Sequence, residues 1–96
     1  MFYKRLLMEK REEILAIASR HGADRIRYFG STVRGEDDEK SDIDFVVVLE
    51  PGRSLFDHID LIDDLKVLLG CEVDVVNERG IKPRIRDRIL AEAIPL

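Results

Sequence analysis

Apolar residues in the first half of the chain recur with two different spacings. Residues 3–21 place them three and four positions apart, which predicts an amphipathic helix that ends at Gly22. Residues 24–29 alternate polar and apolar side chains, which predicts a strand. Residues 42–49 begin with the same alternation and become continuously apolar, which predicts a central strand that is covered on both faces.

Helix and strand patterns alternate again in the second half of the chain. Ser54 is the predicted N-cap of a helix that runs to about Leu69, with Asp57 placed as in a capping box. Residues 71–76 predict a third strand, and residues 84–93 predict a last short helix. This order of elements predicts an α/β fold, in which helices pack on a small sheet of about three strands.

Composition narrows the class of protein. A length of 96 residues predicts one small domain, 1–96, and a domain of this size has apolar surface available for a partner. The net charge of −4 argues against direct nucleic-acid binding. The single Cys71 excludes an internal disulfide, and no segment has the length of a membrane span or the apolar core of a secretory signal. We therefore expect a cytoplasmic protein that does not bind membranes.

The most specific pattern lies between the first two predicted strands. Gly30-Ser31 is followed by ten residues and then by Asp42 and Asp44. A Gly-Ser turn between a strand and a short helical turn exposes backbone N–H groups that favour phosphate, and the serine hydroxyl can add a hydrogen bond. Arg34 could offset phosphate charge there, or it could pair with Asp37 or Asp38. The pattern indicates a phosphate site, with an ordinary strand-ending turn as the alternative.

Asp42 and Asp44 form a carboxylate pair. Side chains two positions apart on a strand point to the same face, with Cα atoms roughly 6.5 Å apart. Such a pair can share a cation, and Mg²⁺ takes one or two protein carboxylates and draws its other ligands from water and phosphate. The alternative is two solvated aspartates at the end of a strand. Asp74, within the third predicted strand, would complete a three-carboxylate cluster or lie on an exposed face or edge strand.

Gly-Ser, ten residues and Asp-x-Asp together resemble the mark of the minimal nucleotidyltransferases, which belong to the DNA polymerase β-like nucleotidyltransferase superfamily. The resemblance covers nearly the whole chain and implies the minimal polymerase β-like fold. It implies that Asp42 and Asp44 ligate two Mg²⁺ ions, and that Asp74 helps to bind metal and to activate the attacking hydroxyl. It also implies that Gly30-Ser31 holds the triphosphate of ATP, with Arg34 as a further nucleotide-binding candidate whose contact is left open.

Residues 82–93 extend the resemblance to members that are antitoxins, encoded with a small all-helical HEPN-domain ribonuclease toxin. This resemblance implies transfer of AMP from ATP to a tyrosine hydroxyl of the toxin, which inactivates it, and a hetero-oligomer of the two proteins. Two alternatives remain. The chain could neutralise its partner by binding alone, or it could transfer a nucleotide to a small molecule or to RNA.

The last predicted helix carries basic residues. Arg84 and Arg88 share one face of it at a spacing of four residues. They could contact an acidic partner or the nucleotide, and a solvated basic helix is the commoner case.

Overall fold

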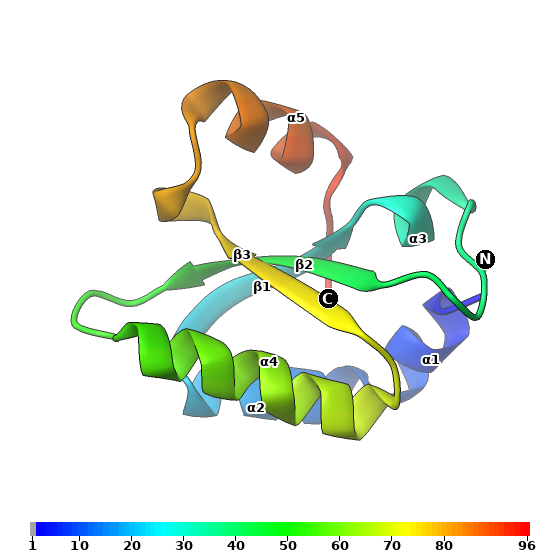
Figure 1. Ribbon diagram of the computed structural model, residues 1–96, viewed down its shortest axis with the longest axis horizontal. Coiled ribbons are helices and arrows are strands. Elements are labelled where there is room, and N and C mark those ends of the chain that lie inside the picture. Colours follow the sequence, from blue (N-terminus) through cyan, green and yellow to red (C-terminus); the bar gives the residue numbers. More distant parts are fainter. Residues whose placement is uncertain (1) are drawn as a thin grey trace.

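Residues 2–96 are described by the computed structural model, and within them four strands form one mixed sheet (Figure 1). The strands are β1 (Ala23–Phe29), β2 (Ile43–Leu49), β3 (Val73–Asn77) and β4 (Ile94–Pro95). They lie in the order β3-β2-β1-β4, with β1 antiparallel to β2 and β4, and β2 parallel to β3. The predicted α/β fold is confirmed. The sheet has one strand more than predicted, because the two residues of β4 are too few to show an alternating pattern.

Helices lie on both sides of this sheet. One face is covered by α1 (Lys4–Glu9), α2 (Arg11–Arg20) and α4 (Leu55–Leu69). On the other side lie α3 (Ser31–Arg34) and α5 (Pro83–Glu92), with α5 above the sheet in Figure 1. None of the ten residues of α5 is buried, in contrast to α2 and α4. Within residues 2–96, no helix combines the length and the apolar character that crossing a membrane requires.

Apolar side chains on one face of β2 determine where Asp44 points. Ile43, Phe45 and Val47 have 0% exposure and belong to the hydrophobic core. The helices contribute Ile14 and Ala18 from α2, and Leu61, Leu65 and Leu69 from α4. Burial of each large side chain stabilises the fold by about 1.5–3 kcal/mol, which fixes the register of the strand. Because successive side chains on a strand alternate, Asp44 is directed to the opposite face, on the side of α5.

The helix predicted over residues 3–21 is divided at Lys10, whose φ of −101° and ψ of 10° separate α1 from α2. Contacts from a distant loop hold the start of α1. The Tyr3 backbone N–H donates to Asp37 Oδ2 at 2.7 Å, and the Tyr3 hydroxyl donates to the Glu39 carbonyl at 3.1 Å. The prediction of one continuous helix was wrong. The contacts that hold α1 join residues 34 and 36 positions apart, which local periodicity cannot reveal.

Asp37→Ala should destabilise the protein by about 1–3 kcal/mol, since it removes the buried acceptor of the Tyr3 N–H. Burial opposes ionisation of Asp37, but the N–H groups of Tyr3 and Phe2 outweigh it and hold the pKa of this carboxyl below its ordinary value of 3.8. The contribution to stability is therefore present at neutral pH and is lost as the pH falls below 3.8. Urea denaturation at pH 7 and at low pH measures both effects.

The matched control for this prediction is Glu39→Ala. This change removes an exposed side chain but keeps the backbone carbonyl that accepts the Tyr3 hydroxyl. We expect it to change the free energy of unfolding by less than about 0.5 kcal/mol. Equal losses in the two variants would contradict the role given to Asp37.

Candidate active site

The turn after β1 depends on Gly30 for two separate reasons. Gly30 has φ 80° and ψ −147°, a backbone conformation that is essentially limited to glycine. A Cβ atom at this position would lie 2.4 Å from Asp44 Oδ2. The carboxylate of Asp44 therefore lies directly against the Gly30 backbone. The Gly-Ser turn is thus in contact with the Asp-x-Asp pair of the motif.

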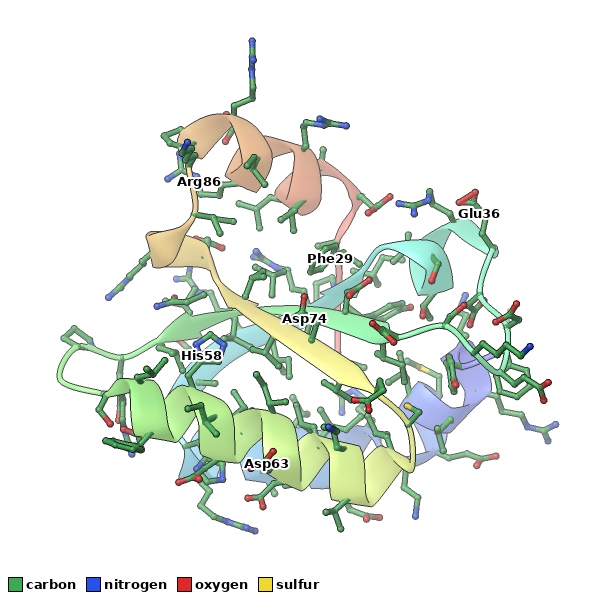
Figure 2. All side chains as sticks on the ribbon, in the orientation of Figure 1. Phe29, Glu36, His58, Asp63, Asp74 and Arg86 are labelled. Carbon is green, nitrogen blue, oxygen red and sulfur yellow. The ribbon has the colours of Figure 1, made fainter. Side chains whose placement is uncertain are left out.

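Asp44 lies between two neighbouring strands, opposite Phe29 on β1 and opposite Asp74 on β3. Adjacent strands in a sheet are about 4.8 Å apart, and residues in register on parallel strands present their side chains to the same face. The structure therefore brings Asp74 beside Asp44. Asp74 is exposed and β3 is an edge strand of the sheet (Figure 2). Asp74 thus lies on an exposed edge strand, as one alternative had it, and its strand position adjoins that of Asp44; the three-carboxylate cluster with Asp42 stays a prediction.

Asp42 lies just before β2 and is exposed, so it is not part of the strand that was predicted to carry it. It nevertheless acts on Asp44 through its charge. Burial raises the pKa of Asp44 to about 6, with further contributions from the negative charges of Asp74 and Asp42, while the Arg34 guanidinium acts in the opposite direction. The negative charges of Asp42 and Asp74 therefore repel that of Asp44, and a bound cation would offset this repulsion.

The arrangement fits Mg²⁺ in the chemistry of its ligands. In the part of the chain that the structure describes, no three His, Cys, Asp or Glu side chains are gathered into a group that could hold a metal ion. Mg²⁺ needs only one or two protein carboxylates when substrate phosphates and water supply its other ligands. Asp44 and Asp74 provide such a pair. The three-ligand role of Asp42, Asp44 and Asp74 stays a prediction.

Arg34 has two partners that the sequence pattern did not indicate. Its Nε donates to Glu36 Oε1 at 2.6 Å, and its Nη1 donates to Glu92 Oε1 at 2.7 Å. The other oxygen of Glu92 accepts the backbone N–H of Gly30 at 2.9 Å. Ser31, the first residue of α3, is half-buried beside this turn. The groups predicted to hold phosphate are therefore adjacent, and a carboxylate of α5 contacts two of them.

A pocket of about 390 Å³ lies at this end of the sheet. Its lining consists of Phe29, Gly30, Arg34 and Asp44 on one side, and Ile85, Arg88, Ile89 and Glu92 of α5 on the other. Phe29 lies between the sheet and α5 in Figure 2. The α5 residues recur at intervals of three and four positions, so they form one face of the helix. Ser31, Asp42 and Asp74 are outside this lining.

The sequence favoured a solvated position for Arg88, but the structure places this residue in the pocket wall. Its spacing of four residues from Arg84 was the available signal, but only the position of α5 over the sheet distinguishes it from a solvated arginine. Glu92 had no signal in the sequence, because its contacts with Gly30 and Arg34 span 62 and 58 positions. Both residues join the candidate site through tertiary structure.

A family model described as a nucleotidyltransferase domain matches residues 9–96. The chain belongs to this nucleotidyltransferase family. The minimal nucleotidyltransferase fold is also confirmed by a solved structure, provisionally described as a minimal nucleotidyltransferase. That structure is 50% identical in sequence with a TM-score of 0.89, and the match covers 100% of this chain and 97% of that one.

Two curated relatives and a further solved structure resemble this chain over most of its length. The protein adenylyltransferase MntA of Thermococcus cleftensis is 38% identical over 94 residues, which cover 93% of this chain and 95% of the relative. A protein of Methanocaldococcus jannaschii, provisionally named a protein adenylyltransferase, is 43% identical over 86 residues, which cover 90% of this chain and 92% of the relative. A crystal structure of a toxin–antitoxin with AMP-PNP has a TM-score of 0.77 at 21% identity and covers 88% of this chain and 69% of that one, which shows a common fold.

Proposed function

We propose that the chain is an antitoxin that transfers AMP from ATP to a hydroxyl group of a partner protein. Relatives that are 38% and 43% identical over nearly their whole length are named protein adenylyltransferases, the latter provisionally. The observation that carries the proposal is the approach of Asp44 to Gly30, which puts a carboxylate suited to a metal ion and a backbone turn suited to phosphate in one pocket. A nucleoside triphosphate with its metal needs groups of both kinds.

The residues of the site have distinct roles in this reaction. The Gly30 N–H and the Ser31 hydroxyl donate hydrogen bonds to the triphosphate, and Arg34 offsets its charge. The attacking hydroxyl oxygen forms a bond to the α-phosphorus as the bond to the bridging oxygen breaks, and pyrophosphate leaves with the electron pair. Asp74, exposed at the edge of the sheet, accepts the proton of the attacking hydroxyl.

Asp42, Asp44 and Asp74 would hold two Mg²⁺ ions. When bound, Mg²⁺ lowers the pKa of a hydroxyl and offsets the charge of the leaving pyrophosphate. The coupling of these aspartates supports the assignment, because two neighbouring carboxylates and burial already disfavour the ionised form of Asp44. Metal binding would therefore offset the negative charge of the three aspartates and keep the Asp44 carboxylate ionised.

The proposed partner is a HEPN-domain ribonuclease toxin that presents a tyrosine, in a hetero-oligomer with this chain. A solved MntA–HepT toxin–antitoxin complex contains a chain with the same fold, at a TM-score of 0.71 and 18% identity. The exposure of Asp74 supports an acceptor that comes from another molecule, since a side chain of a partner can reach it. We also propose that residues 1–96 form a single domain and that the protein is cytoplasmic. The free thiol of Cys71 supports the second point, because the cytoplasm keeps thiols reduced.

Incubation of the chain with its toxin, Mg²⁺ and ATP labelled at the α-phosphate should label the toxin, and a chelator should prevent it. Mass spectrometry should then find one or more AMP groups on a tyrosine, and replacement of that tyrosine by phenylalanine should abolish the label. Absence of label with every nucleoside triphosphate tested would contradict the proposal. Neutralisation by the unlabelled complex without ATP would favour binding alone, and label on RNA or a small molecule would favour the remaining alternative.

A further inference from the structure

Glu92 occupies the groups that the proposed function assigns to the triphosphate. It is the last residue of α5, and its two oxygens accept hydrogen bonds from different donors. Oε2 accepts the Gly30 N–H at 2.9 Å, and Oε1 accepts Arg34 Nη1 at 2.7 Å. A carboxylate oxygen and a phosphate oxygen are both anionic acceptors, and a backbone N–H with a guanidinium is a donor set that suits either. The single N–H of Gly30 cannot serve Glu92 and a phosphate group at the same time, and Glu92 holds one of the Arg34 nitrogens that a phosphate would use.

The attachment of α5 makes this contact displaceable. None of its residues is buried, so little apolar surface holds the helix on the sheet. Beyond its C-terminal end, β4 pairs Ile94 with Tyr28 of β1, and the Leu96 N–H donates to the Ile26 carbonyl. At its other end α5 follows the short 3-10 helix η1 (Glu78–Gly80). Elements with few buried contacts open at low free-energy cost, and the β4 pairing keeps the helix tethered when they do.

Charge favours exchange of Glu92 for a nucleotide. Glu92 contributes one negative charge to the pocket, whose lining also contains the carboxylate of Asp44. A triphosphate brings several negative charges and more acceptor oxygens, together with the cation that the aspartates require. It therefore outcompetes a single carboxylate when metal is present, and Glu92 keeps Arg34 paired when it is absent.

We propose that Glu92 is an internal substitute for phosphate, and that α5 is a latch which the triphosphate must displace from Gly30 and Arg34. The inference rests on the proposed function, because it takes a nucleoside triphosphate as the competing anion. The latch lowers the affinity for nucleotide, because release of Glu92 from Gly30 and Arg34 opposes binding. Removing the carboxylate should increase affinity, whereas removing a residue that helps to bind nucleotide would decrease it.

Titration calorimetry of the full chain with ATP and with inorganic tripolyphosphate, in Mg²⁺, tests the latch. Glu92→Gln should bind both probes about tenfold more tightly than the wild type, as expected for loss of one charge-assisted competitor. Glu36→Gln is the matched control, because Glu36 (labelled in Figure 2) also pairs with Arg34, at 2.6 Å, whereas the Gly30 N–H donates to Glu92. Its affinities should change by less than about twofold, as is typical of an exposed ion pair.

A second variant and a second measurement separate the latch from the proposed function. Glu92→Asp keeps the charge but shortens the side chain, and it should give an intermediate affinity. In the labelling assay Glu92→Gln should lower the KM for ATP by about tenfold, in step with its tighter binding. Equal or weaker binding by Glu92→Gln would overturn the latch. Tighter binding without label transfer by any variant would overturn the proposed function instead, and no binding by any of the proteins would overturn both.

Discussion

Asp44→Asn should lower AMP transfer by at least about 10²–10³-fold and should also make the protein more stable at neutral pH. Activity falls because an amide is a poor ligand for Mg²⁺ and leaves the triphosphate without the cation that the reaction needs. Stability rises because the pKa of Asp44 is raised to about 6 by burial and by the charges of Asp74 and Asp42. The ionised carboxylate therefore costs folding free energy that asparagine does not.

The raised pKa of Asp44 makes the stability of the wild type depend on pH. The folded protein binds the Asp44 proton more tightly than the unfolded chain, whose ordinary pKa is 3.8. Wild-type stability should therefore fall as the pH rises from 3.8 to about 6, and the variant should not show that fall. After a discount for partial exposure, a gain of about 1 kcal/mol corresponds to roughly 4–8 °C in the midpoint for a domain of this size. Scanning calorimetry at several pH values measures it.

Asp60→Asn is a matched control, since Asp60 is an exposed aspartate on α4 outside the site. It should leave transfer and the thermal midpoint nearly unchanged. Addition of Mg²⁺ should stabilise the wild type more than Asp44→Asn, because the variant lacks a ligand. Retention of transfer in Asp44→Asn would contradict the metal role, and an equal response of both proteins to Mg²⁺ would do the same.

Gly30→Ala should abolish nucleotide binding in calorimetry and reduce transfer by at least about 10²-fold. Two physical effects combine. The φ of 80° and ψ of −147° strain any residue with a side chain, at a cost of about 1–3 kcal/mol. The new Cβ would also lie 2.4 Å from Asp44 Oδ2, so the carboxylate must leave its position against the turn. The variant therefore loses the metal ligand and the phosphate donor together.

Gly52→Ala separates the two effects. Gly52 has a comparable φ of 89°, but a Cβ there would meet nothing within 4 Å. This control should lose about 1–2 kcal/mol of stability through backbone strain and keep its transfer activity. If both alanine variants retained activity at similar stability, the contact between Gly30 and Asp44 would not matter for function.

Local patterns determined most of the secondary structure. The helix α4 shows why: Ser54 Oγ accepts the Phe56 N–H at 3.2 Å as an N-cap, and Asp57 Oδ2 accepts the Ser54 N–H at 2.9 Å in the predicted capping box. Both contacts lie within three residues of Ser54, so the sequence itself contains all their partners. The alternation of residues in β1 and the Gly-Ser turn after it were likewise recognisable from the local sequence, although their hydrogen-bond partners are distant.

Tertiary structure decided which of these residues meet. The register of β2 on β3 pairs Asp44 with Asp74, and the position of α5 turns Arg88 and Glu92 into walls of the pocket. These relations follow from packing between elements, which depends on burial of many apolar side chains at once and leaves no short-range periodicity.

The sequence by itself therefore determined the α/β fold class and the spacing of the Gly-Ser and Asp-x-Asp motif. Only the tertiary structure decided that Gly30 and Asp44 touch, and that Glu92, 62 positions away, holds the Gly30 N–H. The physical reason is the range of the interactions. Backbone conformation and side-chain alternation act between near neighbours, whereas a site is assembled by close packing of segments that are distant along the chain.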